Sequence, residues 1–147
     1  AAASDASVRP VITALDQLVR QPELVQQPSE RFDQLNGLLQ KLIERWEART
    51  AWEPKSAVRV QNDVDQSVRI SNLALDQMQE LAGQIGVSNS DFLYRRRYIN
   101  EALIVPLRDY RDQVLAHRMK TQSLSSDGED PDDQPLLIPA TQSLNTN

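Results

Sequence analysis

Apolar residues recur every three or four positions between Phe32 and Trp46, and this spacing constrains the fold more than any other feature of the chain. The period matches the 3.6 residues of a helical turn, so it predicts a helix from Pro28 or Ser29 to about Arg49 with one apolar stripe. The stripe consists of Phe32, Leu35, Leu39, Leu42 and Trp46, widened by Leu38 and Ile43. Two interpretations stay open: the stripe faces the core of its own chain, or it forms a seam along which copies self-associate.

Three further helices are predicted from the same kind of pattern. They cover residues 8–20, residues 72–85, and a long stretch from Ser88 or Ser90 to about residue 120. Gly86 stands where a helix often ends in a left-handed cap, and a serine is a preferred first cap of the helix that follows. Pro106 lies inside the last helix and is expected to kink it or divide it in two, because proline lacks the N–H donor.

Two short runs between the second and third helices alternate apolar and polar residues, as half-buried strands do. They are centred on Val58–Val60 and Val68–Ile70, with Asn62-Asp63 as a turn signal between them. A continuous helix fits the same residues, with Val60, Val64, Val68, Leu75 and Met78 on one face. Both interpretations stay open at this point.

Together these elements predict a mainly α-helical single domain of four to five helices with one or two short β-strands. The domain is expected over residues 1–121, with a strand–helix–helix unit over residues 58–120. Residues 122–147 are expected to form a disordered acidic tail, because they hold five acids and no base. Within this tail, residues 135–139 are apolar. They are either a peptide that docks on a protein partner or a further part of the tail.

The tail carries the whole formal net charge of −5. Removing its five acids leaves 16 acidic and 16 basic residues in positions 1–121. Residues 90–120 hold seven bases against four acids. This local positive balance is compatible with nucleic-acid binding even though the whole chain is acidic.

The composition disfavours most catalytic chemistry. The chain has no Cys, one His and four Gly. It therefore lacks the residues of a disulfide framework, a thiolate metal site, a polyhistidine metal site or a glycine-rich phosphate loop. His117 has no nearby Asp, Ser or Cys partner in the sequence. We therefore expect no enzyme, no metal and no cofactor, and the short apolar runs predict no membrane span.

The most family-like stretch runs from Ser67 to Leu93. It begins Ser-Val-Arg-Ile-Ser, continues as a helix, and passes through Gly-Val-Ser into a second helix with an acid in its first turn. This pattern resembles the ribbon-helix-helix DNA-binding proteins, in which strands from two chains pair into a ribbon that enters the major groove. The resemblance implies that Val68 and Ile70 meet a second copy. It implies that the nucleic acid is contacted by Ser67, Arg69, Ser71, Ser88 and Asn89.

A run of three arginines, Arg95, Arg96 and Arg97, opens two further interpretations. Successive residues on a helix lie about 100° apart, so all three cannot face one partner. The run is either a solvated face, or a phosphate-binding site that uses the planar fork of arginine. Tyr94 and Tyr98 flank it and are expected either to pack or to stack on the bases of a single strand.

A second family-like pattern extends over more of the chain. Two antiparallel helices precede Trp52-Glu53-Pro54 and Val58-Arg59-Val60, and the last helix carries Leu-Ile-Val-Pro-Leu at residues 103–107. This order is similar to that of the coat proteins of rigid rod-shaped plant RNA viruses. The resemblance implies helical self-assembly on RNA, with Arg95, Arg96 and Arg97 near the backbone phosphates.

From the sequence we therefore expect a non-enzymatic, cytoplasmic nucleic-acid-binding protein, such as a dimeric ribbon-helix-helix-like regulator. The alternative is a self-assembling structural protein, such as a helical viral coat or a phage particle component, which would reside in the virion. Homodimers or larger assemblies are expected in both cases. The residues expected to carry self-association are Phe32, Leu35, Leu39, Leu42, Trp46, Val68 and Ile70.

Overall fold

The computed structural model describes residues 8–48 and 56–124, with the backbone alone for residues 121–124. Its α-helices are α2 (Arg9–Arg20), α3 (Pro28–Ala48), α4 (Ala57–Ile85), α5 (Asn89–Ile99) and α6 (Val105–Leu124). A 3₁₀ turn, η1 (Pro22–Leu24), follows α2, and a π-helical turn, η2 (Asn100–Ile104), joins α5 to α6. These ranges contain no strand, so the mainly α-helical class is confirmed and the expected short strands are wrong.

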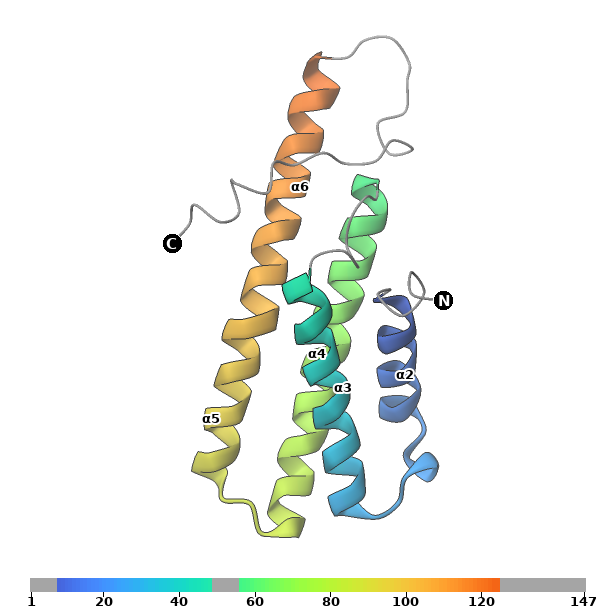
Figure 1. Ribbon diagram of the computed structural model, residues 1–147, viewed down its shortest axis with the longest axis vertical. Helices are drawn as coiled ribbons and strands as arrows, with labels where there is room; N and C mark the ends of the chain where they lie inside the picture. The colour runs from blue at the N-terminus through green and yellow to red at the C-terminus, as the bar shows by residue number, and fades with distance from the viewer. Residues whose placement is uncertain (1–7, 49–55, 125–147) are drawn as a thin grey trace.

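The helices form an antiparallel bundle of the up-down-up-down type (Figure 1). α2 and α4 run in one direction, while α3 and the continuous α5–α6 helix run in the other. α4 packs against α2, α3, α5 and α6, whereas α2 and α6 lie at opposite corners of the bundle. α4 and α6 also extend past the ends of the shorter helices. Arg111 of α6 forms a 2.8 Å ion pair with Asp65 of α4. The hydrogen bond to Asp65 raises the pKa of Arg111 above its ordinary value.

Residues 57–71 are helical throughout, so of the two interpretations of this stretch the continuous helix is correct and the pair of strands is wrong. Ser67, Ser71, Ala74 and Met78 fall on successive turns of one buried face, so the helical period explains the run as well as the strand period does. The expected turn at Asn62-Asp63 is also wrong. Asp63 is buried inside the helix and accepts a 2.6 Å hydrogen bond from Arg9 of α2.

Both ends of α4 have local causes in the sequence. The Ser56 hydroxyl accepts a hydrogen bond from the Arg59 amide at 3.3 Å and caps the first turn. At the other end Gly86 has φ = 82°, and its amide donates to the Ala82 carbonyl. The predicted left-handed glycine cap is therefore confirmed, because only glycine enters this region without steric cost.

Pro106 does not interrupt the last helix. The π turn η2 lies directly before it, and the Val105 amide donates to the Asn100 carbonyl five residues back. The wider turn accommodates a residue that cannot donate a hydrogen bond, so the helix continues to Leu124. The helix therefore continues three residues past the domain boundary expected at residue 121. Residues 125–147, including the apolar segment 135–139, lie outside the described residues, as does Trp52.

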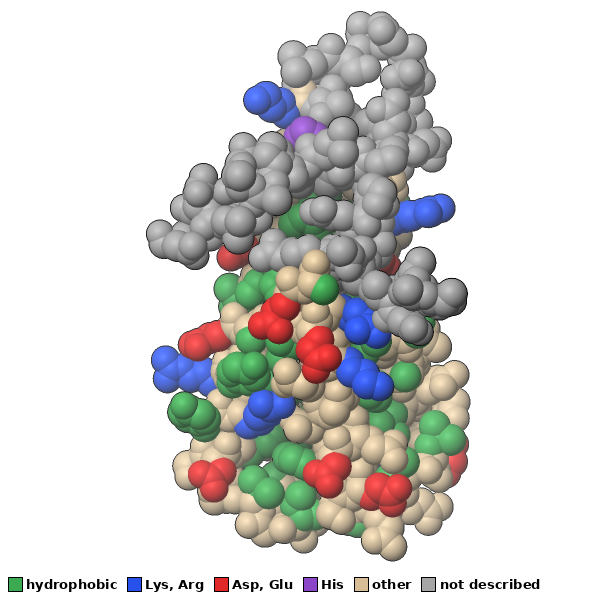
Figure 2. All heavy atoms as spheres, in the orientation of Figure 1, with side chains coloured by type: hydrophobic (Ala, Val, Ile, Leu, Met, Phe, Trp, Pro, Cys, Tyr) green, Lys and Arg blue, Asp and Glu red, His purple; other side chains and the backbone are tan. Residues whose placement is uncertain are grey.

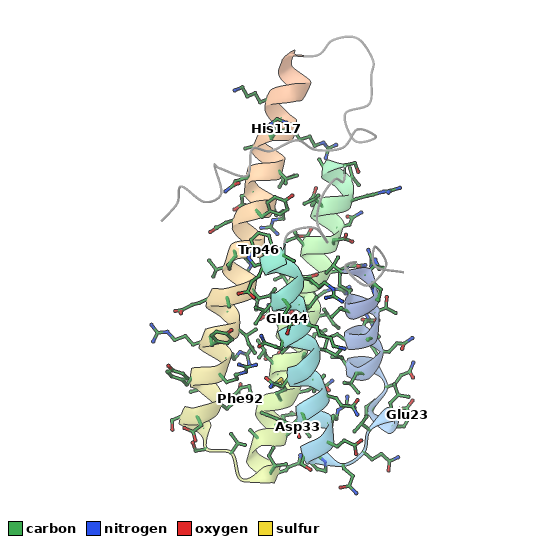
Figure 3. All side chains as sticks on the ribbon, viewed as in Figure 1. Glu23, Asp33, Glu44, Trp46, Phe92 and His117 are labelled. Carbon is green, nitrogen blue, oxygen red and sulfur yellow. The ribbon has the colours of Figure 1, made fainter. Side chains whose placement is uncertain are left out.

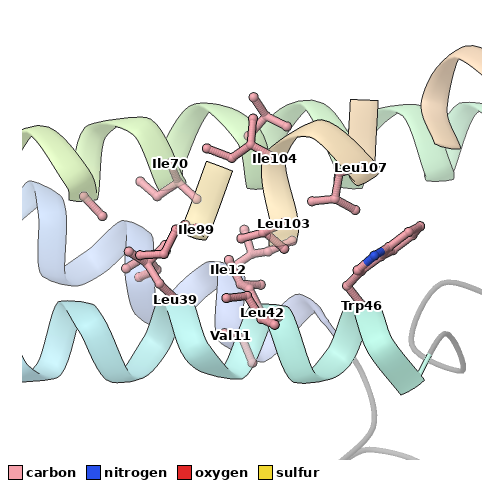
Figure 4. Packing of buried hydrophobic residues seen from close by; sticks show 14 of the residues in the cluster. Val11, Ile12, Leu39, Leu42, Trp46, Ile70, Ile99, Leu103, Ile104 and Leu107 are labelled. Carbon is pink, nitrogen blue, oxygen red and sulfur yellow. The ribbon is translucent and has the colours of Figure 1, made fainter. Parts of the chain in front are cut away.

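The apolar stripe of α3 packs inside the bundle (Figure 4). Leu35, Leu39 and Leu42 are fully buried, and Trp46 packs on Tyr110 of α6 with ring centroids 5.6 Å apart. Phe32 is half-buried and meets Phe92 of α5 edge to face at 6.3 Å. Together with Val68 and Ile70, which are also buried, these side chains form an intramolecular core. In this fold they are covered within the chain, as the first of the two interpretations predicts.

Candidate nucleic-acid interface

α5 carries the arginine run, Tyr94 and Tyr98, and it buries few of its own side chains. Ser88 caps its first turn by accepting a 3.1 Å hydrogen bond from the Asp91 amide, as the sequence predicts. Phe92 and Ile99 are its buried residues, and Figure 3 places Phe92 on the side facing the bundle. The rest of the helix surface is therefore left for polar and aromatic side chains.

The three arginines point in three directions, as their spacing requires. Arg95 turns toward α3, where its Nε donates to the Asn36 side chain at 2.8 Å. Arg96 turns toward α4 and forms a 2.8 Å ion pair with Asp76. Arg97 points outward, where its Nε meets Glu101 one turn later at 3.1 Å.

These arginines differ in how their charge is balanced. Arg96 and Arg97 each have a carboxylate partner. Arg95 hydrogen-bonds to the neutral amides of Asn36 and Gln40, and its guanidinium carbon lies 5.1 Å from the centre of the Tyr98 ring. No carboxylate of the described residues pairs with Arg95, so it keeps a positive charge beside an aromatic ring.

Tyr94 and Tyr98 form the outward part of the same surface. Their exposed fractions are 79% and 42%, and they lie one helical turn apart. Together with Arg95, Arg97 and Glu101 they line a shallow hollow of about 580 Å³. We call these five residues the α5 face. Figure 2 shows apolar, basic and acidic side chains intermixed along the edge of the molecule where α5 lies.

A smaller hollow, of about 280 Å³, continues from the α5 face toward α4. It contains the half-exposed Leu93, and its other walls mix apolar side chains, Leu75 and Ile104, with polar ones such as Asn72 and Asn100. Arg97 lines both hollows, so the two adjoin at this side chain.

The structure separates the residues that the sequence grouped as a nucleic-acid site. Ser67 and Ser71 have no exposed surface, because they lie on the inner side of α4. Arg69 is exposed on the other side of that helix. Ser88 and Asn89 are exposed at the start of α5, so they lie on the same element as the arginine run.

Sequence reasoning missed the contribution of α3 to this surface. Asn36 and Gln40 hold Arg95 from 59 and 55 residues away in the chain. Their spacing of four residues places them on one side of a helix, but many exposed residues share that spacing. Only the packing of α3 beside α5 shows that they orient Arg95.

In residues 8–48 and 56–124, no cluster of three or more His, Cys, Asp or Glu side chains could hold a metal ion. None of the helices in these ranges is both long enough and apolar enough to cross a membrane.

The chain matches no protein-family model, and neither a curated protein nor a solved structure matches it.

Proposed function

We propose that the chain is a non-enzymatic nucleic-acid-binding protein and that its α5 face binds a single strand. The observation that carries the proposal is the exposed pair Tyr94 and Tyr98, one turn apart and interleaved with Arg95 and Arg97. Proteins that bind single strands combine aromatic rings, on which bases stack, with cations along the backbone. The α5 face has both components on one helix.

The spacing of the tyrosines favours an extended single strand over a duplex. Four residues of helix advance about 6 Å, whereas stacked bases in a duplex advance only about 3.4 Å. Two rings at the wider spacing fit bases that have separated from each other. Each base–ring stack is worth about 1–3 kcal/mol.

The arginines supply two kinds of phosphate contact. Arg95 has no carboxylate to displace, and its hydrogen bonds to Asn36 and Gln40 hold it in place beforehand. The ion pair between Arg97 and Glu101 is exposed on both sides, with 78% of the Arg97 side chain accessible. Such pairs contribute only about 0–1 kcal/mol, so Arg97 can exchange Glu101 for a phosphate at little cost.

The proposal does not use the ribbon implied by the first family resemblance. That ribbon requires residues 67–71 to be extended, but here they are part of α4 and two of them, Ser67 and Ser71, are buried. The nucleic-acid role therefore rests on Arg95 and Arg97, and Arg69 has no part in it.

The test is fluorescence anisotropy of a labelled 15-nucleotide oligo(dT) with the full chain. Changing both Tyr94 and Tyr98 to Ala removes two stacking platforms, so we expect the dissociation constant to rise at least about tenfold. Phe at both positions keeps the rings and is expected to keep the affinity. Arg95→Gln is expected to weaken binding and to reduce the slope of log K against log salt by about 0.7, the value for one single-strand phosphate.

Arg59→Gln is the matched control, because Arg59 is an exposed arginine on α4, away from the α5 face. We expect it to change affinity less than Arg95→Gln does. Equal affinity of the double Tyr→Ala variant and the original chain would contradict the proposal. Equal affinity for duplex and single strand would contradict it as well.

A further inference from the structure

A second surface of the molecule has no role in the proposed nucleic-acid function. It is a groove of about 620 Å³ between α2 and α3. Its apolar lining consists of Ala14, Leu18, Leu24, Val25, Gly37 and Leu38. Leu24 is 54% exposed, so the groove presents apolar surface to the outside. Glu30 and Lys41 are the first and last residues of α3 in the lining of the groove.

Gly37 leaves room in the middle of this groove. A Cβ atom added at this position would meet no atom within 4 Å. Gly37 is in the interior of a helix, where glycine is less favourable than alanine by about 0.5–1 kcal/mol. The helix itself therefore does not need this glycine, and the open space suits a side chain from outside.

The outward side of α4 carries a surface that fits the groove. Leu73 is 42% exposed there, with Arg69 one turn before it and Glu80 two turns after it. Arg69 and Glu80 are both exposed, and neither has an ion-pair partner among the described side chains. An apolar side chain is thus flanked by two opposite charges.

The spacings of the two surfaces agree. Glu30 and Lys41 are eleven residues apart on α3, and Arg69 and Glu80 are eleven residues apart on α4. Both intervals correspond to about 16 Å of helix. If the helices run in the same direction, Arg69 faces Glu30 and Glu80 faces Lys41. In the reverse direction Arg69 would face Lys41, and Glu80 would face Glu30, so like charges would meet.

In the favourable orientation Leu73 also comes close to the apolar lining of the groove. Leu73 stands four residues after Arg69, which brings it opposite Gln34, a groove residue four positions after Glu30. Gly37 and Leu38 are one turn further along the same side of α3. The Leu73 side chain therefore comes beside Gln34, within one helical turn of Leu38 and of the open space at Gly37.

From these features we infer that a second copy of this chain docks in the α2–α3 groove through the outward side of its α4. Each copy carries both surfaces, on different helices, so the contact is heterologous. Such a contact builds rings or open-ended assemblies and does not stop at one pair. The inference goes beyond nucleic-acid binding and uses none of the residues of the α5 face.

Sedimentation velocity of the full chain without nucleic acid, over a range of concentrations, tests this inference. We expect the average mass to rise above the 16.6 kDa of one chain as concentration increases. Leu73→Asn and Lys41→Glu are each expected to raise the concentration needed for association at least tenfold. Both positions are exposed, and far-ultraviolet circular dichroism checks that each variant is folded.

The double variant Lys41→Glu with Glu80→Lys provides the sharpest comparison, because it exchanges the two charges of one contact. We expect it to associate like the original chain, while each single change weakens association. Glu44→Lys, an exposed change elsewhere on α3, is the matched control and is expected to have no comparable effect. The variant that lacks Tyr94 and Tyr98 should still associate.

Three results would each overturn the inference. One is a mass of a single chain at every concentration. Another is association that Leu73→Asn and Lys41→Glu leave unchanged, which would mean that copies meet through another surface. The third is failure of the double charge exchange to restore association.

Discussion

Arg31 lies in the first turn of α3 with its guanidinium buried beneath the end of α2. It donates to the carbonyl of Leu18, to the more distant carbonyls of Pro22 and Val25, and to the Gln77 side chain of α4 at 2.7 Å. A cation at the end of a helix satisfies carbonyls that have no partner within the helix. Arg31 thereby fixes the connection between α2 and α3, next to the groove proposed for a second copy.

Replacing Arg31 with Met should destabilise the protein strongly. The apolar side chain leaves the buried Leu18 carbonyl and the partly buried Gln77 side chain without this donor, so we expect the free energy of unfolding to fall by about 2–4 kcal/mol. Urea denaturation followed by circular dichroism measures the change. Arg20→Met is the control, because Arg20 makes an exposed ion pair with Asp16 and should matter little. Equal losses from both changes would contradict this role for Arg31.

Ser67 and Ser71 show what a short sequence pattern leaves undecided. In Ser-Val-Arg-Ile-Ser, the strand period places both serines outside with Arg69, and the helical period places them together on one inner face. Five residues cannot separate these periods. The structure places both serines in the core, where no described group hydrogen-bonds to their hydroxyls.

At the level of elements, the residues next to a helix end predicted where the helix stops. The sequence predicted less well which segments are helical. Gly86 and Ser88 mark the turn between α4 and α5, because each satisfies backbone groups next to it. The sequence of the first half of α4 fits both a strand and a helix, because the choice depends on contacts with other helices, such as that of Arg9 with Asp63. The π turn before Pro106 was not predictable, since a proline signals a missing hydrogen bond without indicating which distortion compensates for it.

Two glycines should respond in opposite ways to the same substitution. Gly37→Ala should raise the free energy of unfolding by about 0.5–1 kcal/mol, because its added Cβ meets no neighbour and the helix gains a better helix former. Gly86→Ala should lower it by about 1–2 kcal/mol, because Gly86 has φ = 82°. Thermal and urea denaturation of both variants measure the effect. A change of the same sign in both would contradict the assigned backbone conformations.

At the scale of the whole molecule, the sequence indicated a candidate surface but not its composition. The arginine run and Tyr94 and Tyr98 were visible as residues close together in the chain. Which arginine keeps an unpaired charge was not visible, because the partners of Arg95 and Arg96 come from α3 and α4. Exposure of the tyrosines likewise depends on which side of α5 meets the bundle.

The acidic tail should weaken nucleic-acid binding through its charge. A chain ending at Leu124 loses five acids and no base, which changes the formal net charge from −5 to zero. We expect it to bind oligo(dT) about three- to tenfold more tightly at low salt, with the difference fading as salt screens the charges. A full-length chain with the five acids changed to Asn and Gln should behave in the same way. Unchanged affinity at low salt in both variants would contradict an electrostatic role of the tail.

The most direct test of the central claim is photo-crosslinking of a single-stranded oligonucleotide that carries 5-iodouracil, followed by mass spectrometry of the crosslinked peptides. If the α5 face binds the strand by stacking, crosslinks should concentrate at Tyr94 and Tyr98, and an excess of unlabelled single strand should suppress them. Crosslinks that concentrate on α2, α3 or α4 and are absent from α5 would contradict the account.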